Sequence, residues 1–360
     1  MTHRFGEQAT AWLAALEARK RKPVSPATLA TYRAHVNRLL PLVGAETLLS
    51  EIHNGFLKSL AGRIPGSAKT IGETLAALKQ IVASAVDPAT GEQIYPRAWN
   101  HAFIDAPTVK DQRQPCATVE QVNKAIKDAR SHQEQLLYVI LAGTGLRISE
   151  ALAIRVGVVA EDQTSFLEAE GVIIIKVRAS IWKNQEYRGK LKTAAAKRDI
   201  DLDPRLPSRI AEFISKYKIQ PGQFLFQSEN GAVSNLETVT RRLRQRGIPG
   251  FHSFRRYRLT HLRKARVPET LLRTWMGHSS KDVSDKYDKT AEDVEHRTHF
   301  AKAAGLGFDL QHLGHPTRAR KRRSRLERMQ ITLKGDAKPV SYAATDEDLP
   351  AFFFAPEAAP

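Results

Sequence analysis

One interruption of the helical pattern does most to constrain the fold of this chain. The stretch from Asp87 to Gln114 is rich in Pro, Gly, Asp and Asn and loses helical periodicity, which is typical of a connector. A chain of 360 residues is also longer than one hydrophobic core usually serves. We therefore expect a boundary near residues 106–116, between a first domain of residues 1–110 and a second of residues 111–310, with residues 311–360 as a tail.

The first domain is expected to be helical. Ser25 can cap a helix that has Pro26 at its first position, and apolar residues then recur at helical spacing until Pro41. A second helix is expected to start at Ser67. This domain is expected to have basic edges, formed by Lys58, Arg63, Lys69 and Lys79. They fit both a plain helical bundle with solvated lysines and a surface that contacts an anionic partner.

The second domain is expected to be mainly helical with one small sheet. Thr118 can cap a helix, another helix should end at the turn of residues 143–145, and a further one should open near Arg147. The β-branched run Val172–Val177 and the alternating segment Asp199–Leu202 predict a small antiparallel sheet among these helices. The expected fold class is therefore mainly α with a small antiparallel β-sheet.

The charge of the chain points to a polyanionic partner. The formal net charge is +18, and the basic residues are spread along the whole length. Nucleic acid and an anionic membrane surface both fit this charge. However, no apolar run approaches the roughly 18 residues of a membrane-spanning helix, and no signal peptide is evident at the start. We therefore expect a nucleic-acid-binding protein of the cytoplasm that associates with the nucleoid, without a membrane partner.

Cysteine and histidine usage argues against a metal site. Cys116 is the only cysteine, so disulfides within the chain and a thiolate cluster are both excluded. The 12 histidines form no close metal-binding motif with Asp or Glu. No metal and no other cofactor is expected.

Five short motifs of the second domain stand out together. They are Thr144–Glu150 (TGLRISE), Lys192–Thr193, His252–Arg255 (HSFR), Gly277–Ser280 (GHSS), and Tyr287, nine residues after His278. Each motif alone has an ordinary explanation, such as a helix salt bridge or a surface aromatic residue. In this order and spacing, the motifs resemble those of the tyrosine recombinase family, the phage-integrase-like enzymes, from about Thr118 to Tyr287.

These residue types suit attack on a phosphodiester. Arg147 and Arg255 can each donate two parallel hydrogen bonds to phosphate oxygens, and His278 can add another. A phenol with a pKa of about 10 is a poor nucleophile, but a cationic pocket helps to remove its proton. His252 is the candidate base that would accept the proton from Tyr287.

Two more residues have expected roles at this site, the first from the resemblance and the second from its spacing. It implies that the general acid is a lysine on the hairpin between two strands, which corresponds best to Lys192, although Lys190 and Lys197 are close in sequence. Glu150 lies three residues after Arg147 on the same helix face and could hold its guanidinium in place.

The resemblance also implies an activity and an assembly. Family members cut and rejoin DNA through a 3′-phosphotyrosine without a nucleotide cofactor, and four protomers exchange strands between two specific duplex sites through a four-way junction. The first domain would be the core-binding domain, whose basic edges contact phosphates. Arg256 and Arg258 would add DNA contacts from the second domain. The tail tilts the expectation toward an integrase of a mobile element.

Two other functions stay open. A type IB topoisomerase uses the same residue types but relaxes supercoils as a monomer, and a non-catalytic relative would only bind DNA. Beyond Tyr287, apolar residues from Val294 to Leu306 could form a helix that passes to a neighbouring protomer or packs on its own domain. The basic stretch Arg318–Arg328 could add DNA affinity or be a solvated tail.

Overall fold

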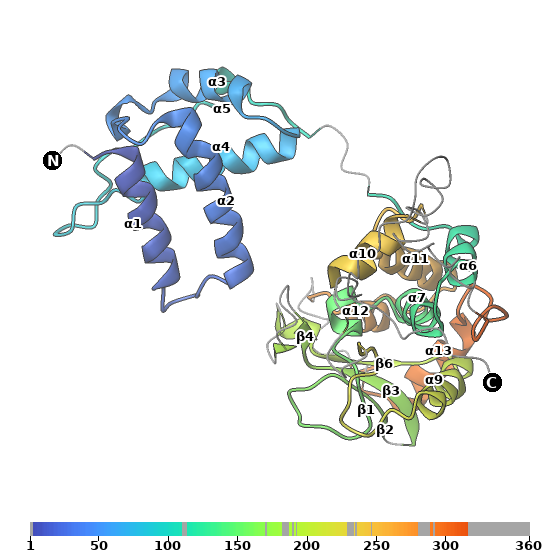
Figure 1. Cartoon of the computed structure of the whole chain (residues 1–360). Helices are drawn as coiled ribbons and strands as arrows, with labels where there is room; N and C mark the ends of the chain where they lie inside the picture. The colour runs from blue at the N-terminus through green and yellow to red at the C-terminus, as the bar shows by residue number, and fades with distance from the viewer. Residues whose placement is uncertain are drawn as a thin grey trace, which may run out of the picture. The chain divides into compact units, whose positions relative to one another are not determined.

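The chain folds into two compact units, Met1–Arg113 and Gln114–Pro360 (Figure 1). The computed structural model describes residues 3–109, 114–169, 171–181, 187–188, 191, 193–228, 234, 236–245, 247–279, 289–290 and 292–315. Each unit has a hydrophobic core of its own. Most of the expected tail, from residue 316 onward, lies outside the described residues, and so does the basic stretch Arg318–Arg328.

The described part of unit 1 is helical. Its elements are α1 (Phe5–Glu17), α2 (Pro26–Val43), the 3₁₀ turn η1 (Leu49–Glu51), α3 (Asn54–Arg63), α4 (Ala68–Ala83) and α5 (His101–Ile104). Ser25 and Ser67 cap α2 and α4, because each side chain accepts the backbone N–H three residues on, at 3.2 Å. The expected helix starts are therefore confirmed, and the apolar faces of these helices meet in one core.

The sequence predicts that helix α2 ends at Pro41, but the helix continues past this residue. The helix continues to Val43, and the chain leaves it at Gly44, whose φ of 93° suits glycine. A proline removes one backbone donor, but so close to the end of a helix it costs only that one hydrogen bond. The next turn is intact, since the N–H of Gly44 donates to the carbonyl of Leu40 at 3.0 Å.

Unit 2 is mainly helical around a small sheet (Figure 1). Its helices are α6 (Val119–Lys127), α7 (His132–Thr144), α8 (Ile148–Ala151), α9 (Arg205–Lys216), α10 (Leu236–Arg244), α11 (Phe251–Lys264), α12 (Glu269–Met276) and α13 (Val294–Ala304), with a 3₁₀ turn η2 (Ala194–Ala196). Thr118 caps α6, as expected. Helix α7 is buried from Gln133 to Thr144, which explains why it is apolar almost all round.

The two predicted strand segments pair antiparallel, as expected, but the sheet as a whole is mixed. Its strands are β1 (Arg155–Val156), β2 (Ser165–Ala169), β3 (Val172–Val177) and β6 (Arg198–Asp201), in the order β1-β2-β3-β6; β4 (Ser180–Ile181) and β5 (Tyr187–Arg188) form a separate antiparallel pair. Strands β2, β3 and β6 pair antiparallel, but β1 runs parallel to β2. The connection of residues 157–164 carries the chain back to the same end of the sheet, so both strands point the same way.

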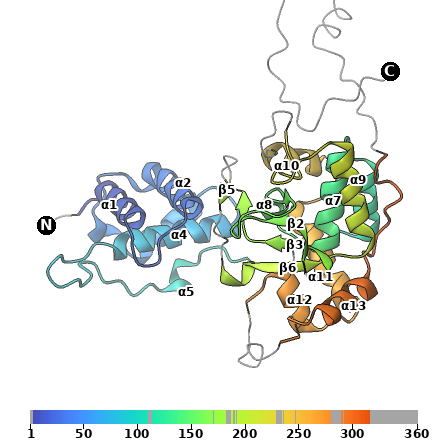
Figure 2. The ribbon, with the colours of Figure 1, turned by 90° about the horizontal axis from the view of Figure 1, so that it is seen from below.

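Helix α13 packs on its own unit. Ala301 is buried in a cluster with residues of α11 and α12, and Phe300 packs against that cluster. Figure 2 shows α12 and α13 beside β6. Their polar link is Asp201 of β6, which accepts the indole N–H of Trp275 at 2.8 Å and the Nε of Arg297 at 3.2 Å. The sequence left open whether this helix passes to a neighbouring protomer or packs on its own domain, and in the structure it packs on its own domain. None of the described helices is long and apolar enough to cross a membrane.

Candidate active site

Two glycine turns of unit 2 bring the sequence motifs together. Helix α7 ends at Gly145 with a φ of 71°, and α12 ends at Gly277 with a φ of 60°. A Cβ at Gly145 would lie 2.6 Å from the Cε of Met276, so the two turns touch because the first one carries no side chain. The turn that leads to Arg147 and the turn that leads to His278 are thus neighbours.

Arg255 of α11 ties these two turns together. Its Nη1 donates to the carbonyl of Gly145 at 2.8 Å, and its Nη2 donates to the carbonyl of Met276. The same Nη2 lies 3.1 Å from the Nε2 of His278. Burial, together with the charges of Arg147 and Arg198, lowers the pKa of Arg255 to about 10, so the guanidinium remains cationic at neutral pH.

Arg147 and Glu150 form the expected pair. Arg147 immediately precedes α8, and its Nη1 lies 2.7 Å from the Oε1 of Glu150. The backbone N–H of Arg147 also donates to Oε2 at 3.0 Å. The Arg147 side chain is 34% exposed and the Glu150 side chain only 2%, so the carboxylate holds the guanidinium from below while the guanidinium still faces solvent.

A second arginine, which the sequence analysis missed, lies behind Glu150. Arg198 of β6 is buried, and its Nη2 lies 2.9 Å from the Oε2 of Glu150. Its Nε donates to the carbonyl of Trp275 at 2.7 Å. Arg198 and Glu150 are 48 residues apart, so no local spacing reveals the pair. The only sequence signal was an arginine directly before the segment Asp199–Leu202, which predicts a strand.

His252 and His278 are in contact with solvent, but protein atoms partly enclose their imidazole rings, and the pKa of each is lowered. For both imidazoles burial is the largest cause, followed by the charge of Arg255. Both side chains are therefore neutral at neutral pH. A neutral imidazole can accept a proton or donate a hydrogen bond, which are the roles expected for these two residues.

The two further basic residues expected to contact DNA from α11 differ from each other. Arg256 is half-buried, and its Nη1 donates to the carbonyl of Pro115 at 2.9 Å. Arg258 is buried at 3% exposure and donates to the carbonyl of Gly305 at 2.6 Å. The expectation of a DNA contact is wrong for Arg258. It lies one turn after Arg255 on the face of α11 that points into the unit, where it fixes the segment after α13.

Two of the expected catalytic residues, Lys192 and Tyr287, lie outside the described residues. The alternative Lys190 does too, while Lys197 is exposed just before β6. Arg147, Glu150, His252, Arg255 and His278 are described. Contacts through Glu150, Arg198 and Arg255 connect the Gly145 and Gly277 turns, and His252 lies one helical turn before Arg255 on α11. The structure therefore describes the two arginines and two histidines of the expected site, whereas the expected nucleophile and general acid lie outside the described residues.

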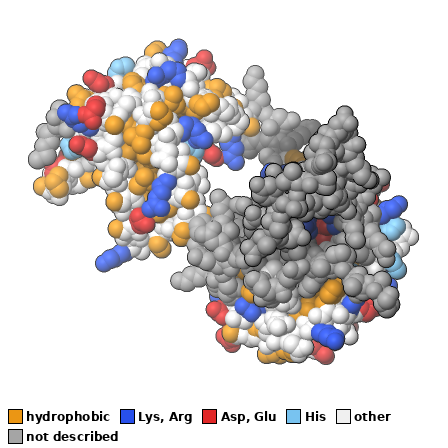
Figure 3. Space-filling model, viewed as in Figure 1, with side chains coloured by type: hydrophobic (Ala, Val, Ile, Leu, Met, Phe, Trp, Pro, Cys, Tyr) orange, Lys and Arg blue, Asp and Glu red, His pale blue; other side chains and the backbone are white. Residues whose placement is uncertain are grey.

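The basic residues of unit 1 are mostly exposed. Arg63 donates to the carbonyl of Leu42 at 2.9 Å, and Lys69 lies 3.8 Å from Glu73. Lys58 and Lys79 lie over the rings of Phe103 and Trp99, at 4.9 and 5.6 Å from the ring centroids. Figure 3 shows basic side chains scattered over the visible face of unit 1 among hydrophobic and polar ones. This surface can touch phosphates at several points but forms no focused anion pocket on that face.

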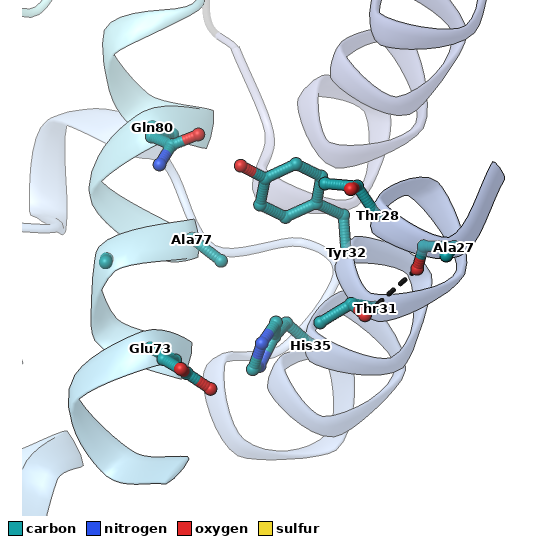
Figure 4. A pocket seen from close by; sticks show the side chains of 9 residues that line it. Ala27, Thr28, Thr31, Tyr32, His35, Glu73, Ala77 and Gln80 are labelled. Carbon is teal, nitrogen blue, oxygen red and sulfur yellow. Dashed lines mark hydrogen bonds between the residues drawn. The ribbon is translucent and has the colours of Figure 1, made fainter. Parts of the chain in front are cut away.

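A hollow of about 410 Å³ lies in unit 1 between α2 and α4 (Figure 4). Tyr32 and His35 line it from α2, and Glu73 and Gln80 line it from α4. No lysine or arginine lines it, which makes it unsuited to a phosphate. The described residues also contain no cluster of His, Cys, Asp and Glu that could hold a metal ion.

Comparison with known proteins decides the family. The model of the phage integrase family matches residues 116–293, a range that contains all five motifs. The chain belongs to the phage integrase family of tyrosine recombinases. It is thus a recombinase enzyme by family. None of the curated proteins matches the chain in sequence.

Solved integrases have the same fold as this recombinase. The integrase of transposon Tn1549, in complex with transposon right end DNA, is 18% identical with a TM-score of 0.55, over 81% of this chain and 95% of that one. A lambda integrase from a tetramer bound to a Holliday junction is 15% identical with a TM-score of 0.57, over 79% of each chain. A lambda integrase from a dimer on a core site is 16% identical with a TM-score of 0.52, over 82% of this chain and 95% of that one. These similarities establish a two-domain tyrosine recombinase fold.

Proposed function

We propose that this recombinase breaks and rejoins DNA strands at specific sites through a covalent bond between Tyr287 and the 3′ phosphate. The observation that carries the proposal is the linkage of Arg147, Arg255 and His278 at two touching turns, beside the neutral imidazole of His252. A phosphodiester is an anion, and its transition state gathers charge on the nonbridging oxygens. Two fixed guanidinium groups and an imidazole are suited to bind those oxygens.

The proposed reaction conserves the energy of the ester. The phenolic oxygen of Tyr287 attacks the phosphorus, its proton passes to His252, and the bond from phosphorus to the 5′ oxygen breaks. The leaving 5′ oxygen takes a proton from a general acid, which we assign to Lys192. A phosphotyrosine replaces the phosphodiester, so a 5′ hydroxyl from another strand can reverse the reaction without ATP.

Exchange between two sites needs more than one protomer. We propose that four copies assemble on two duplex sites and exchange strands in two rounds through a four-way junction. Support comes from the solved lambda integrase, which is a tetramer bound to a Holliday junction. The helical unit 1 would act as the core-binding domain, with Lys58, Arg63, Lys69 and Lys79 as phosphate contacts. The Tn1549 integrase, also solved on DNA, makes a mobile-element role the favoured one.

The test uses nicked duplexes tiled across the DNA that flanks the gene for this protein. A nick beside the cleavage point lets the short downstream fragment, which carries the new 5′ hydroxyl, diffuse away, so the covalent complex accumulates. The wild type should form an adduct that survives denaturation, and Tyr287→Phe should not. If Tyr287→Phe still traps DNA, the nucleophile lies elsewhere.

Two alternatives predict different products. A type IB topoisomerase would relax any supercoiled plasmid without producing recombinants, and a non-catalytic relative would bind DNA without forming an adduct. A plasmid that carries two copies of the cleaved sequence should instead yield recombinants with this protein. Relaxation of a plasmid without sites, in the absence of recombinants, would favour the topoisomerase.

A further inference from the structure

We infer that Arg198 is a positioning residue of the recombinase: it holds Glu150 so that Glu150 can orient Arg147 toward the DNA phosphate. The inference deepens the proposed function and rests on it. Arg198 has no place among the five motifs, and its side chain is only 1% exposed, so it does not reach a DNA phosphate itself. Its effect on the reaction must pass through the groups that it contacts.

The contacts of Arg198 divide between the two turns of the site. Both oxygens of Glu150 accept hydrogen bonds from it, Oε2 from Nη2 at 2.9 Å and Oε1 from Nη1 at 3.4 Å. The remaining contacts go to backbone carbonyls, from Nε to Trp275 at 2.7 Å and from Nη1 to Ala196 at 2.9 Å. Trp275 lies three residues before His278. One guanidinium therefore fixes both the carboxylate below Arg147 and the end of α12 that leads to His278.

Glu150 is shared between two arginines with different exposure. Its Oε1 and Oε2 also accept hydrogen bonds from the Nη1 and the backbone N–H of Arg147, at 2.7 and 3.0 Å. Burial alone would raise the pKa of Glu150, but the charge and hydrogen bonds of Arg198, followed by those of Arg147, lower it. Arg198 thus keeps Glu150 ionised inside the unit. An ionised Glu150 can hold the partly exposed Arg147 in one orientation.

The Gly277 turn is built around the same guanidinium. A Cβ at Gly277 would lie 3.0 Å from the Nη1 of Arg198 and 3.1 Å from the carbonyl of Ala195. Glycine at this position gives the guanidinium room and also permits the φ of 60°. The position before His278 therefore favours glycine partly because a side chain there would crowd the guanidinium of Arg198.

The experiment measures single-turnover cleavage of the nicked duplex at saturating protein, and DNA affinity separately. Arg198→Gln should cleave about 10–100-fold more slowly than wild type, as is usual when a residue that orients a functional group is lost. DNA affinity should stay at its wild-type value, because Arg198 does not reach the duplex. Arg198→Lys restores the charge beside Glu150 and should recover part of the loss.

A double-variant cycle separates positioning from general folding. If Arg198 acts through Glu150, the variant with both Arg198→Gln and Glu150→Gln should cleave no more slowly than Glu150→Gln alone. This double variant removes both charges of the buried Arg198–Glu150 pair together, so it remains informative if Arg198→Gln fails to fold. Losses that multiply in the double variant would overturn the inference.

Arg178 supplies a matched control. It lies just after β3, and its Nη2 pairs with Asp199 at 2.7 Å, but its hydrogen bonds go to the carbonyls of Val177 and Arg198 and not to Glu150. Arg178→Gln should cleave at close to the wild-type rate. If Arg198→Gln cleaves as fast as Arg178→Gln, Arg198 has no positioning role. If the wild type itself forms no adduct, the proposed function fails, and the inference that rests on it fails too.

Discussion

The two units of the recombinase bury different kinds of side chain. Among the described residues of unit 1, the buried polar side chains are His35 and Thr74, and the rest of its core is apolar. The described part of unit 2 buries charged side chains as well, including Glu150, Arg198, Asp201, Arg255 and Arg258. A buried charge loses its hydration and is tolerated only with close partners. The difference shows that unit 2 is organised around groups that must stay charged and fixed.

The largest effect is expected from substitution of Arg255, a buried charge of unit 2, because this change tests the difference between the two units most directly. Loss of one fixed donor to a developing negative charge costs about 10²–10³ in rate. Arg255 also links the two turns, so Arg255→Ala should slow single-turnover cleavage by about 10³-fold, or roughly 4 kcal/mol. Arg255→Lys keeps the charge but loses the planar fork, and should recover only part of the rate. A rate for Arg255→Ala within tenfold of wild type would contradict this role.

A core substitution in unit 1 should act on that unit alone. Leu39 is fully buried, and Leu39→Ala should destabilise unit 1 by about 2–5 kcal/mol. Hydrogen exchange measured along the chain should show lost protection in α1–α4 and unchanged protection in α7. Leu137→Ala, at an equally buried position of unit 2, is the matched control and should reverse the pattern. Equal loss of protection in both units would mean that the cores are not independent.

A smaller effect concerns a buried histidine of unit 2. Burial and the charge of Lys216 lower the pKa of His132 to about 4, and its ring packs on Phe213 with the centroids 5.2 Å apart. A lowered pKa means that the unfolded chain takes up the proton first. Stability should therefore be complete above pH 6.5 and decrease as the pH falls toward 4, by about 2 kcal/mol after allowance for solvent screening.

The check is urea unfolding of unit 2 at pH 7 and pH 5. His132→Phe keeps an aromatic ring beside Phe213 but cannot take up a proton, so its stability should depend less on pH than that of the wild type. An equal decrease in both proteins would assign the pH dependence to other groups.

The smallest effect tests the scattered cations of unit 1. If Lys58 contacts a DNA phosphate, Lys58→Ala should reduce the slope of log affinity against log salt by about 1. Arg209 is exposed on α9 of unit 2 and paired with Glu212 at 3.0 Å, and Arg209→Ala is the control expected to leave the slope unchanged. An unchanged slope for Lys58→Ala would remove this residue from the interface.

Local features of the fold could be predicted from the sequence. Ser25 and Thr118 cap the helices that they were expected to cap, and Ser67 caps the helix that was expected to start there. Such caps are local, because a capping side chain contacts a backbone group only three residues away. The run Val172–Val177 is strand β3 with the bounds expected. The parallel pairing of β1 depends on where a loop returns the chain, and local patterns carry no such information.

Site residues were predictable as far as they belong to compact motifs. The pair of Arg147 and Glu150 is three residues apart, and the structure contains it. Arg198 was missed because its partner lies 48 residues away, and Arg258 was misassigned because burial on the inner face of α11 is a tertiary property. The roles of Lys192 and Tyr287 stay predictions, since both lie outside the described residues.

The most direct test of the account is the chemical identity of the covalent bond to DNA. The adduct formed on a nicked duplex can be digested with protease and nuclease, and the modified peptide identified by mass spectrometry. The account predicts a 3′-linked nucleotide on the phenolic oxygen of Tyr287 and a free 5′ hydroxyl on the released strand. A nucleotide linked through its 5′ phosphate, or attached to any other residue, would contradict it.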